Sequence, residues 1–331
     1  MMRSARTLVL TLARILALWL LVAFPTHAQD PAANWPAKQV KLIIPFPPGG
    51  STDFQGRLLC DWLSRHFNQT FFIEHKPGAG SNIGVAETAR SAPDGYTMGW
   101  ITVASHAINP TLYAKMPFDH IKDFAPISMV GTFPNLLVVH NALPVTTVPQ
   151  LIALLKKEPG KYTFASSGQG TSLHLSGEMF KVMTGTDMIH VPYKGGGPAL
   201  QDLIGGQVHM TFGNMPTVLG QAKGGKVRAV AVTSAERWFT APEIPTIAET
   251  VPGFVAMSWH GVAFPAATSA AIVDKLAVAI RRGLATPELS ETFAKGGSKA
   301  TSMSPQQFAA FIREDTDRWA PVIRAAGARV D

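Results

Sequence analysis

The stretch from Val40 to Asp53, VKLIIPFPPGGSTD, constrains the fold more than any other part of the chain. The apolar run Val40–Ile44 predicts a buried strand, Pro45–Gly50 can continue neither strand nor helix, and Ser51 to Asp53 are residue types that begin helices. The apolar residues that follow recur at helical spacing: Phe54, Leu58, Trp62 and Phe67. A strand, a glycine turn and a helix in this order leave the first N–H groups of the helix unpaired beyond the strand end. Such a corner attracts anions.

A second corner of the same kind follows more than a hundred residues later. Tyr162–Ser166 predicts a strand, Ser167–Gly170 a glycine turn, and Thr171 to Met183 a helix. If each corner belongs to its own lobe and the lobes face one another, a small anion is held between two opposed helix N-termini.

The first 28 residues have the features of a secretory signal peptide. Arg3, Arg6 and Arg14 precede the apolar run Ile15–Phe24, and small residues occupy the cleavage positions up to Ala28. The run is too short for a membrane anchor. We therefore expect export to the periplasm, with cleavage near Ala28.

Charge and cysteine content narrow the functional classes. The formal charge of +7 includes the three leader arginines, which leaves +4 on the mature chain. The basic residues are dispersed, so we expect no nucleic-acid partner. Cys60 is the only cysteine and falls inside a predicted amphipathic helix, where we expect it to pack in the core, and it allows no disulfide.

Strand and helix patterns alternate through the mature chain, which predicts an α/β fold with a parallel-rich sheet in each of two lobes. We expect lobe 1 to comprise residues 29–130 and 258–331, and lobe 2 residues 131–257. The chain then crosses between the two lobes twice, near Ile127–Phe133 and Ser258–Phe264. Two such crossings form a hinge between the lobes. Ser105–Asp123 is expected to be irregular, and the second lobe's first strand to begin at Leu136.

Enzyme chemistry is the alternative class. Ser167 or Thr171 with His174 suggests a secreted serine- or threonine-type hydrolase, but no G-x-S-x-G elbow is present. His174 and Glu178 share a helix face without further ligands at metal-binding spacing. Gly78–Gly84 only approximates a dinucleotide fingerprint, and tight strand-to-helix packing explains its glycines better. We expect no cofactor, no metal and no enzymatic activity.

The two corners supply the candidate ligand-binding residues, and four further residues are expected at the pocket walls. Asp53 either accepts from loop N–H groups and holds the turn, or contacts an amino group of the ligand. Lys194 either faces the cleft as a counter-charge or is solvated. Phe46, His106 and Asn214 are expected walls.

Several motifs together resemble the substrate-binding proteins of tripartite tricarboxylate transporters, also called the Bug family of extracytoplasmic solute receptors. They extend in order over the mature chain: PFPPGGSTD (Pro45–Asp53), KPGAGSNIG (Lys76–Gly84), PDGYT (Pro93–Thr97), SSGQGTSLHLSGE (Ser166–Glu178), PYKGGGPALQDLIGGQV (Pro192–Val208), GKVRAVAVTSAER (Gly225–Arg237) and WAPVIRAAG (Trp319–Gly327).

The resemblance implies a type II-like periplasmic binding protein with a Venus-flytrap cleft that closes on a small organic carboxylate. Family ligands include di- and tricarboxylates, acidic amino acids, nicotinate and aromatic acids. The partner implied is a membrane transporter or a sensor, and the receptor is expected to be monomeric. Carried onto this sequence, the family's ligand loops correspond to Pro48, Gly49, Gly50, Ser51 and Asp53, and to Ser166, Ser167, Gly168, Gly170 and Thr171.

This chain departs from the family pattern at some positions. His75 stands where asparagine is common, and Gly213-Asn214 occupies a place that often carries aspartate. The second difference bears on the ligand, because removing a negative charge near the pocket admits a more anionic or differently shaped guest.

Overall fold

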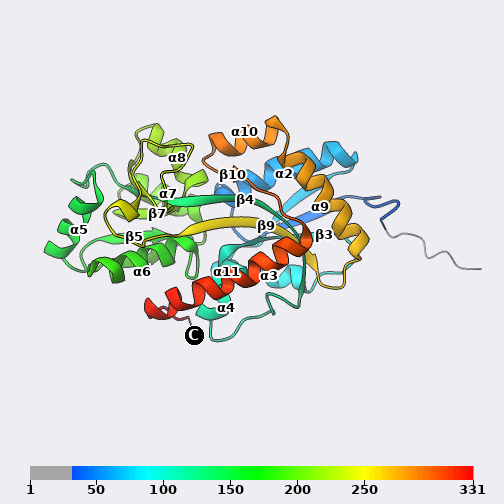
Figure 1. The fold of residues 1–331 in the computed structure, drawn as a ribbon, viewed down its shortest axis with the longest axis horizontal. Coiled ribbons are helices and arrows are strands. Elements are labelled where there is room, and N and C mark those ends of the chain that lie inside the picture. Colours follow the sequence, from blue (N-terminus) through cyan, green and yellow to red (C-terminus); the bar gives the residue numbers. More distant parts are fainter. Residues whose placement is uncertain (1–31, 331) are drawn as a thin grey trace, which may run out of the picture.

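The computed structural model describes residues 32–330, which form two groups of strands and helices connected by long strands (Figure 1). The strand order is β2-β1-β3-β9-β4-β7-β5-β6, with β8 and β10 also paired to β4. The expected leader lies outside the described residues. Within residues 32–330, no helix combines the length and the apolar character needed to cross a membrane.

The first group is built on strand β1, which pairs in parallel with β2 and β3, while β9 closes this part of the sheet antiparallel to β3. Its strands are β1 (Val40–Ile44), β2 (Phe71–His75), β3 (Thr97–Thr102), β9 (Met257–Pro265) and β10 (Lys299–Ala300). Its helices are α2 (Ser51–Phe67), α3 (Asn82–Ala89), α4 (Asn109–Leu112), α9 (Ala270–Leu284), α10 (Pro287–Lys295) and α11 (Pro305–Ala325).

The second group is built on strand β5, which pairs in parallel with β6 and β7. Its strands are β5 (Thr163–Ser166), β6 (Ile189–Pro192), β7 (Met210–Asn214) and β8 (Arg228–Val232). Its helices are α5 (Val148–Lys157), α6 (Ser172–Thr184), α7 (Gly196–Ile204) and α8 (Met215–Lys223). The expected parallel pairing in each half of an α/β fold is therefore present.

Strand β4 (Phe124–Val139) is a single 16-residue strand that belongs to both groups. Its residues up to Pro134 pair with β9, and from Asn135 onward they pair with β7 and β8. The sequence predicted a strand only from Leu136, because prolines and a glycine interrupt the earlier apolar pattern. The register shifts near Pro126 and Gly131 explain why the strand tolerates them, since bulges admit such residues.

Two further predictions need correction. The segment expected to be irregular contains one helical turn with π-type bonding, Ala104–Ile108, followed directly by α4. Helix α10 was also not predicted, although it begins with Thr286 as N-cap and Pro287 in the first turn. Helix α5 has a side-chain cap, because the Thr147 hydroxyl accepts from Gln150 N.

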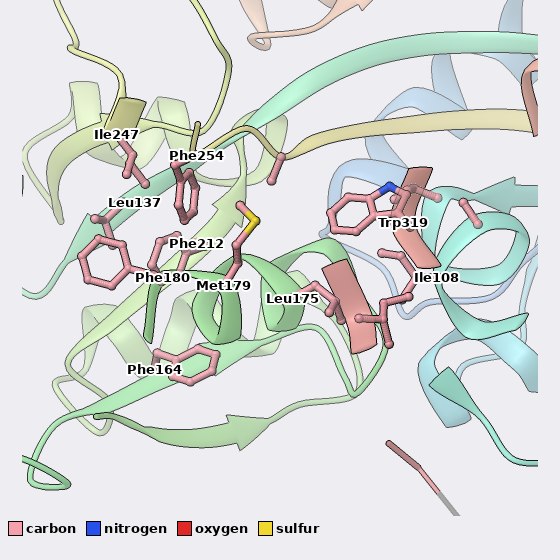
Figure 2. Packing of buried hydrophobic residues seen from close by; sticks show 14 of the residues in the cluster. Ile108, Leu137, Phe164, Leu175, Met179, Phe180, Phe212, Ile247, Phe254 and Trp319 are labelled. Carbon is pink, nitrogen blue, oxygen red and sulfur yellow. The ribbon is translucent and has the colours of Figure 1, made fainter. Parts of the chain in front are cut away.

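A buried apolar cluster fills the space around α6 and continues toward the first group (Figure 2). Phe164, Phe180, Phe212 and Phe254 pack together in the second group, each with none of its surface exposed. Further along α6, Leu175 belongs to the same cluster as Ile108 and Trp319, which lie in the first group, so the apolar core is continuous between the two groups. Cys60 is buried in a separate cluster under α2, and burial raises its pKa to about 12.

Helix α6 allows a matched test of this core. Phe180 is fully buried, whereas Val182, on the same helix, is 54% exposed. Phe180→Ala is expected to lower the free energy of unfolding by about 3–5 kcal/mol, because it leaves a cavity among aromatic rings. Val182→Ala should change it by less than about 0.5 kcal/mol. Urea denaturation of both variants measures the difference, and similar losses in the two would contradict this description of the core.

Candidate functional site

A cavity lies where several strands of both groups end and the following helices begin. The carboxyl ends of β1, β3, β5 and β7 all contribute to it, as expected for the crevice at the strand ends of an α/β fold. It is lined by Phe46, Gly50, Ser51, Thr52, Thr102, Val103, Ala104, Ser167, Thr171, Ser172, Leu173, Gly196, Asn214, Ser258 and His260.

The N-termini of α2 and α6 both face this cavity. The first backbone hydrogen bonds that close these helices are Phe54 N to Gly50 O and Leu175 N to Thr171 O. Neither helix has a side-chain cap: Gly50 has no side chain, and the Thr171 hydroxyl donates to Gly168 O instead. The N–H groups of the first turn are therefore available to an acceptor in the cavity.

The first loop is held in shape by Asp53. Its Oδ2 accepts from Gly49 N at 3.0 Å, and its Oδ1 lies 3.0 Å from Arg57 Nε. His75 adds a second brace, with Nδ1 2.7 Å from Phe46 O and Nε2 3.2 Å from Asp53 Oδ1. Gly49 has φ +89°, a conformation that favours glycine. Asp53 thus takes up the loop-supporting role that the sequence suggested, and its carboxylate does not line the cavity.

The second loop is held by hydroxyl groups and by two histidines behind it. Ser166 Oγ lies 2.6 Å from His190 Nε2 and accepts from Gly168 N at 3.1 Å. The His190 ring stacks on the His174 ring, with centroids 4.2 Å apart. Gly170 N donates to His174 Nδ1 at 3.3 Å. Both imidazoles therefore support the backbone of the loop.

Polar side chains connect the two groups at the cavity wall. Ser51 Oγ, at the start of α2, donates to Asn214 Oδ1 at 3.2 Å. Asn214 Nδ2 in turn donates to Asn135 Oδ1 at 2.7 Å, and Ser172 Oγ donates to the same oxygen at 3.3 Å. The starts of α2, α6 and α8 are thereby joined through Asn135, on the shared strand β4.

Two hydroxyl groups in the cavity wall lack partners. Thr52 and Thr102 are each 4% exposed, and neither Oγ1 atom has a hydrogen-bond partner within the described part of the chain. A buried hydroxyl without a partner is unfavourable, so each is available to a bound polar group.

None of the residues lining the cavity is an aspartate, glutamate, lysine or arginine. The ionisable side chain that does line it, His260, is fully buried, and burial lowers its pKa to about 3. Its Nδ1 lies 2.8 Å from Gln55 Oε1. The cavity therefore presents neutral donors at physiological pH, and a bound anion is held by dipoles instead of a counter-charge.

The predicted site residues fall into three sets. Those that line the cavity are Phe46, Gly50, Ser51, Ser167, Thr171 and Asn214. Gly168 and Lys194 line a neighbouring pocket, together with Phe46 and Ser167. Pro48, Gly49, Asp53, Ser166 and Gly170 lie in the loops behind the wall.

His106 was expected to line the ligand pocket, and this prediction needs correction. It is fully buried between the rings of Phe118 and Phe124, at centroid distances of 6.2 and 4.7 Å, and it does not line the cavity. Burial holds its pKa well below the ordinary value. His106 comes soon after β3 in the sequence, but the helical turn Ala104–Ile108 directs it into the core.

Several lining residues were not predicted from the sequence. Thr102 ends strand β3 and is followed by a helical turn, so it could have been recognised as a further strand-to-helix corner. Ser258 and His260 come from the second expected crossing, where nothing local distinguishes a cavity side chain from a core side chain.

The groups required for the hydrolase alternative are engaged elsewhere. The Thr171 hydroxyl donates to Gly168 O, and His174 Nδ1 accepts from Gly170 N. Gly84, in the segment that approximates a dinucleotide fingerprint, packs tightly against the residues that follow β1 and β2, because a Cβ there would lie 3.0 Å from Pro45 Cα and 2.8 Å from Lys76 O. Among residues 32–330, no cluster of side chains suited to a metal ion is found.

The fold and the cavity define an α/β binding protein with a cavity at the strand ends of its two groups. Residues 56–328 match the family model described as the tripartite tricarboxylate transporter family receptor. The chain belongs to this family, which consists of periplasmic solute-binding receptors and not enzymes.

Known relatives are similar over nearly their whole length. Protein BugT of Bordetella pertussis is 38% identical over 301 residues, covering 90% of this chain and 92% of that protein. The structure of R. palustris Rpa4515 with adipate has a TM-score of 0.88 and 37% identity, covering 89% of this chain and 100% of that one. MatC from Rhodopseudomonas palustris, with bound malate, has a TM-score of 0.84 and 28% identity, covering 87% and 100%.

The histidine pair behind the second loop predicts sensitivity to acid. Burial, reinforced by Lys181, lowers the pKa of His174 to about 4, and burial, His174 and Lys181 lower that of His190 to about 3. Because both folded-state values lie below the unfolded value of 6.5, the unfolded chain takes up protons first as the pH falls. Their contribution to stability is therefore complete above about pH 6.5 and is lost toward pH 4 to 3.

His174→Asn isolates one of these groups, since an amide oxygen can still accept from Gly170 N. Between pH 7 and pH 5, the unmodified protein should lose about 2 kcal/mol more of its unfolding free energy than the variant. Urea denaturation at the two pH values measures this. Equal losses in both proteins would show that His174 is not held neutral by the fold.

Proposed function

We propose that this protein is a periplasmic receptor that holds a small organic carboxylate in the cavity between two lobes. It presents the ligand to a transporter of the tripartite tricarboxylate type or to a sensor, and acts as a monomer. The observation that carries the proposal is the pair of helix N-termini, α2 and α6, whose first-turn N–H groups face one cavity without side-chain caps. Lobe 1 comprises residues 29–130 and 258–331, and lobe 2 residues 131–257.

Backbone donors of this kind suit a carboxylate. Each charge-assisted hydrogen bond contributes about 1.5–3 kcal/mol, and a helix N-terminus adds about 0.3–1 kcal/mol. About four such bonds, less the entropy lost on ordering, reach the roughly 8 kcal/mol of a micromolar receptor. Among the candidate residues, those of the glycine loops bind the ligand through backbone N–H groups and hydroxyls, while Asp53 and Ser166 keep the loops in place.

The lining favours a carboxylate without an amino group. An ammonium group needs a carboxylate or several carbonyl acceptors, and no acidic residue lines the cavity. The nearest candidate, Asp53, is already engaged by Gly49 N and Arg57. Di- and tricarboxylates are therefore favoured over acidic amino acids within the family's range, which also includes nicotinate and aromatic acids. Adipate and malate, named with Rpa4515 and MatC, are the first ligands to test.

The proposal includes export of the receptor to the periplasm. Residues 1–28 form a signal peptide that is cleaved near Ala28, so the receptor operates in the periplasm. N-terminal sequencing of protein recovered from the periplasm tests the cleavage point, and a start upstream of residue 20 would contradict it.

Isothermal titration against a panel of mono-, di- and tricarboxylates, with the matching amino acids, tests the ligand class. At least one carboxylate should bind with a Kd in the micromolar range or tighter, and amino acids should bind more weakly than their unsubstituted analogues. Folded protein that binds no member of the panel, with any retained ligand first removed by unfolding and refolding, would refute the carboxylate receptor.

Thr102→Val should change binding and stability in opposite directions. The substitution removes a buried hydroxyl that lacks a partner, so the free energy of unfolding should rise by about 1 kcal/mol, while carboxylate affinity falls about tenfold. Thr268 provides the matched control, because its buried hydroxyl is also without a partner in the described structure but does not line the cavity. Thr268→Val should stabilise the protein without weakening binding, as measured by urea denaturation and titration.

Gly50→Val tests the first corner with little disturbance of the fold. Gly50 has an extended backbone, with φ −97°, and an added Cβ would have no neighbour closer than Gly197 N at 3.9 Å. Stability should change by less than about 1 kcal/mol. Carboxylate affinity should fall at least about tenfold, because the side chain occupies space at the helix N-terminus.

Valine substitutions at two other glycines, Gly220 and Gly170, are compared with Gly50→Val. Gly220→Val, on α8 with open space around it, should bind normally and serves as the control. Gly170→Val is the poorer test, since Gly170 has φ +79° and its added Cβ would lie 2.0 Å from Asn109 Oδ1, so it should destabilise the fold as well. Normal binding by Gly50→Val would place the site elsewhere.

A further inference from the structure

A second pocket adjoins the cavity and shares two of its wall residues, Phe46 and Ser167. Residues from both groups of strands line it, including Ser81 and Tyr113 on one side and Gly168 and Lys194 on the other. We call it the outer pocket. Phe46 and Ser167 border both spaces, so the two lie side by side at these residues.

One wall of the outer pocket is a strained backbone segment. Four consecutive residues, Gly78 to Ser81, have positive φ angles of 137°, 47°, 57° and 90°. The second and fourth, Ala79 and Ser81, carry side chains, for which this conformation is unfavourable. The segment touches the second loop, since a Cβ on Gly80 would lie 2.1 Å from Gln169 O. The surrounding structure thus holds Ser81 in a conformation that its own preferences oppose.

The strained segment buries a polar group at the pocket wall. Ser81 is 1% exposed, and its Oγ has no hydrogen-bond partner among the described residues. A buried hydroxyl in this situation is unfavourable unless a ligand or water uses it. Tyr113 offers a second hydroxyl, and burial raises its pKa, so that it remains a proton donor.

The opposite wall carries a positive charge. Lys194 lies at the rim, exposed, and forms no ion pair with any residue between 32 and 330. No aspartate or glutamate lines this pocket. The inner cavity has neutral donors only, so the positive charge of the combined site lies at the outer end.

We propose that the outer pocket binds the far carboxylate of an elongated dicarboxylate, through Ser81 Oγ and Lys194 Nζ. The near carboxylate lies at the N-termini of α2 and α6, as in the proposed function on which this inference rests. Phe46, 8% exposed and common to both spaces, packs against the hydrocarbon chain between them. The receptor therefore selects its ligand by the distance between two anionic groups.

Titration of terminal dicarboxylates with four to eight carbons, each beside the monocarboxylate of equal length, tests this directly. The quantity of interest is the ratio of dicarboxylate to monocarboxylate affinity at each length. The ratio should exceed about tenfold at the best length and decline on either side of it. Lys194→Met should lower the ratio about fivefold, which is the contribution of one exposed charge. Lys194→Arg should restore most of it.

Ser81→Gly should lower the same ratio about tenfold, because it removes a buried donor while glycine accepts the positive φ. Lys156→Met is the matched control, since Lys156 is exposed on α5 in the same group as Lys194 and does not line either space. It should leave the ratio unchanged.

The outcomes separate the two proposals. If monocarboxylates and dicarboxylates bind equally at every length, or if neither Lys194→Met nor Ser81→Gly changes the ratio, the outer subsite is refuted while the carboxylate receptor stands. If no carboxylate binds at all, both are refuted. A ratio that depends on length and falls in both variants supports the outer subsite.

Discussion

The unpaired N–H groups in the first turns of α2 and α6 are the constraint on which the rest of the structure depends. A helix cannot satisfy these groups internally, and here neither N-cap residue does so with a side chain. The strands aim both helix starts at one cavity, and the residues behind each corner fix its shape. Asp53 and His75 brace the first loop, and Ser166 with His190 braces the second. Much of the buried polar network thus positions backbone donors.

Because the cavity lining carries no aspartate, glutamate, lysine or arginine, the proposed receptor would bind an anion without forming a buried ion pair. A buried ion pair loses solvation on both partners, and its strength depends closely on geometry. Dipoles that already point into the cavity require little reorganisation when the ligand arrives, and no buried cation remains uncompensated when it leaves. His174 and His190 lie behind the second loop, so acid acts on these supports before it acts on the backbone donors. Selection among carboxylates would then depend on the shape of the cavity and on contacts with the end of the ligand that lies away from the helix N-termini.

The parts of the fold that could be predicted from sequence are those encoded locally. The two strand-to-helix corners were recognised because proline, glycine and capping residues stand in order within about a dozen positions. Strand β4 was predicted only in part, since its prolines and glycine are tolerated by bulges that depend on the partner strand β9. His106 was misplaced for a related reason: its burial follows from aromatic rings that are distant in sequence or in the next segment. Ser258 and His260 enter the cavity only through the pairing of β9 with β3 and β4.

The same core that stabilises the fold limits how the two parts can separate. Leu175 of α6 belongs to the cluster that includes Ile108 and Trp319 (Figure 2). A Cβ on Gly170 would meet Asn109 Oδ1. Separation would expose this apolar surface to water and break the hydrogen bond between Ser51 and Asn214. These contacts need no ligand, so part of the free energy of closure is supplied by the protein itself. A ligand shifts the equilibrium between the open and closed forms only if it binds the closed form more tightly. It would do so because the N-termini of α2 and α6 contact it together only in the closed form. If the proposed lobes move apart, we expect the movement to be concentrated where β4 changes partners, between Pro134 and Asn135, and at the start of β9, because these strands connect the two groups there.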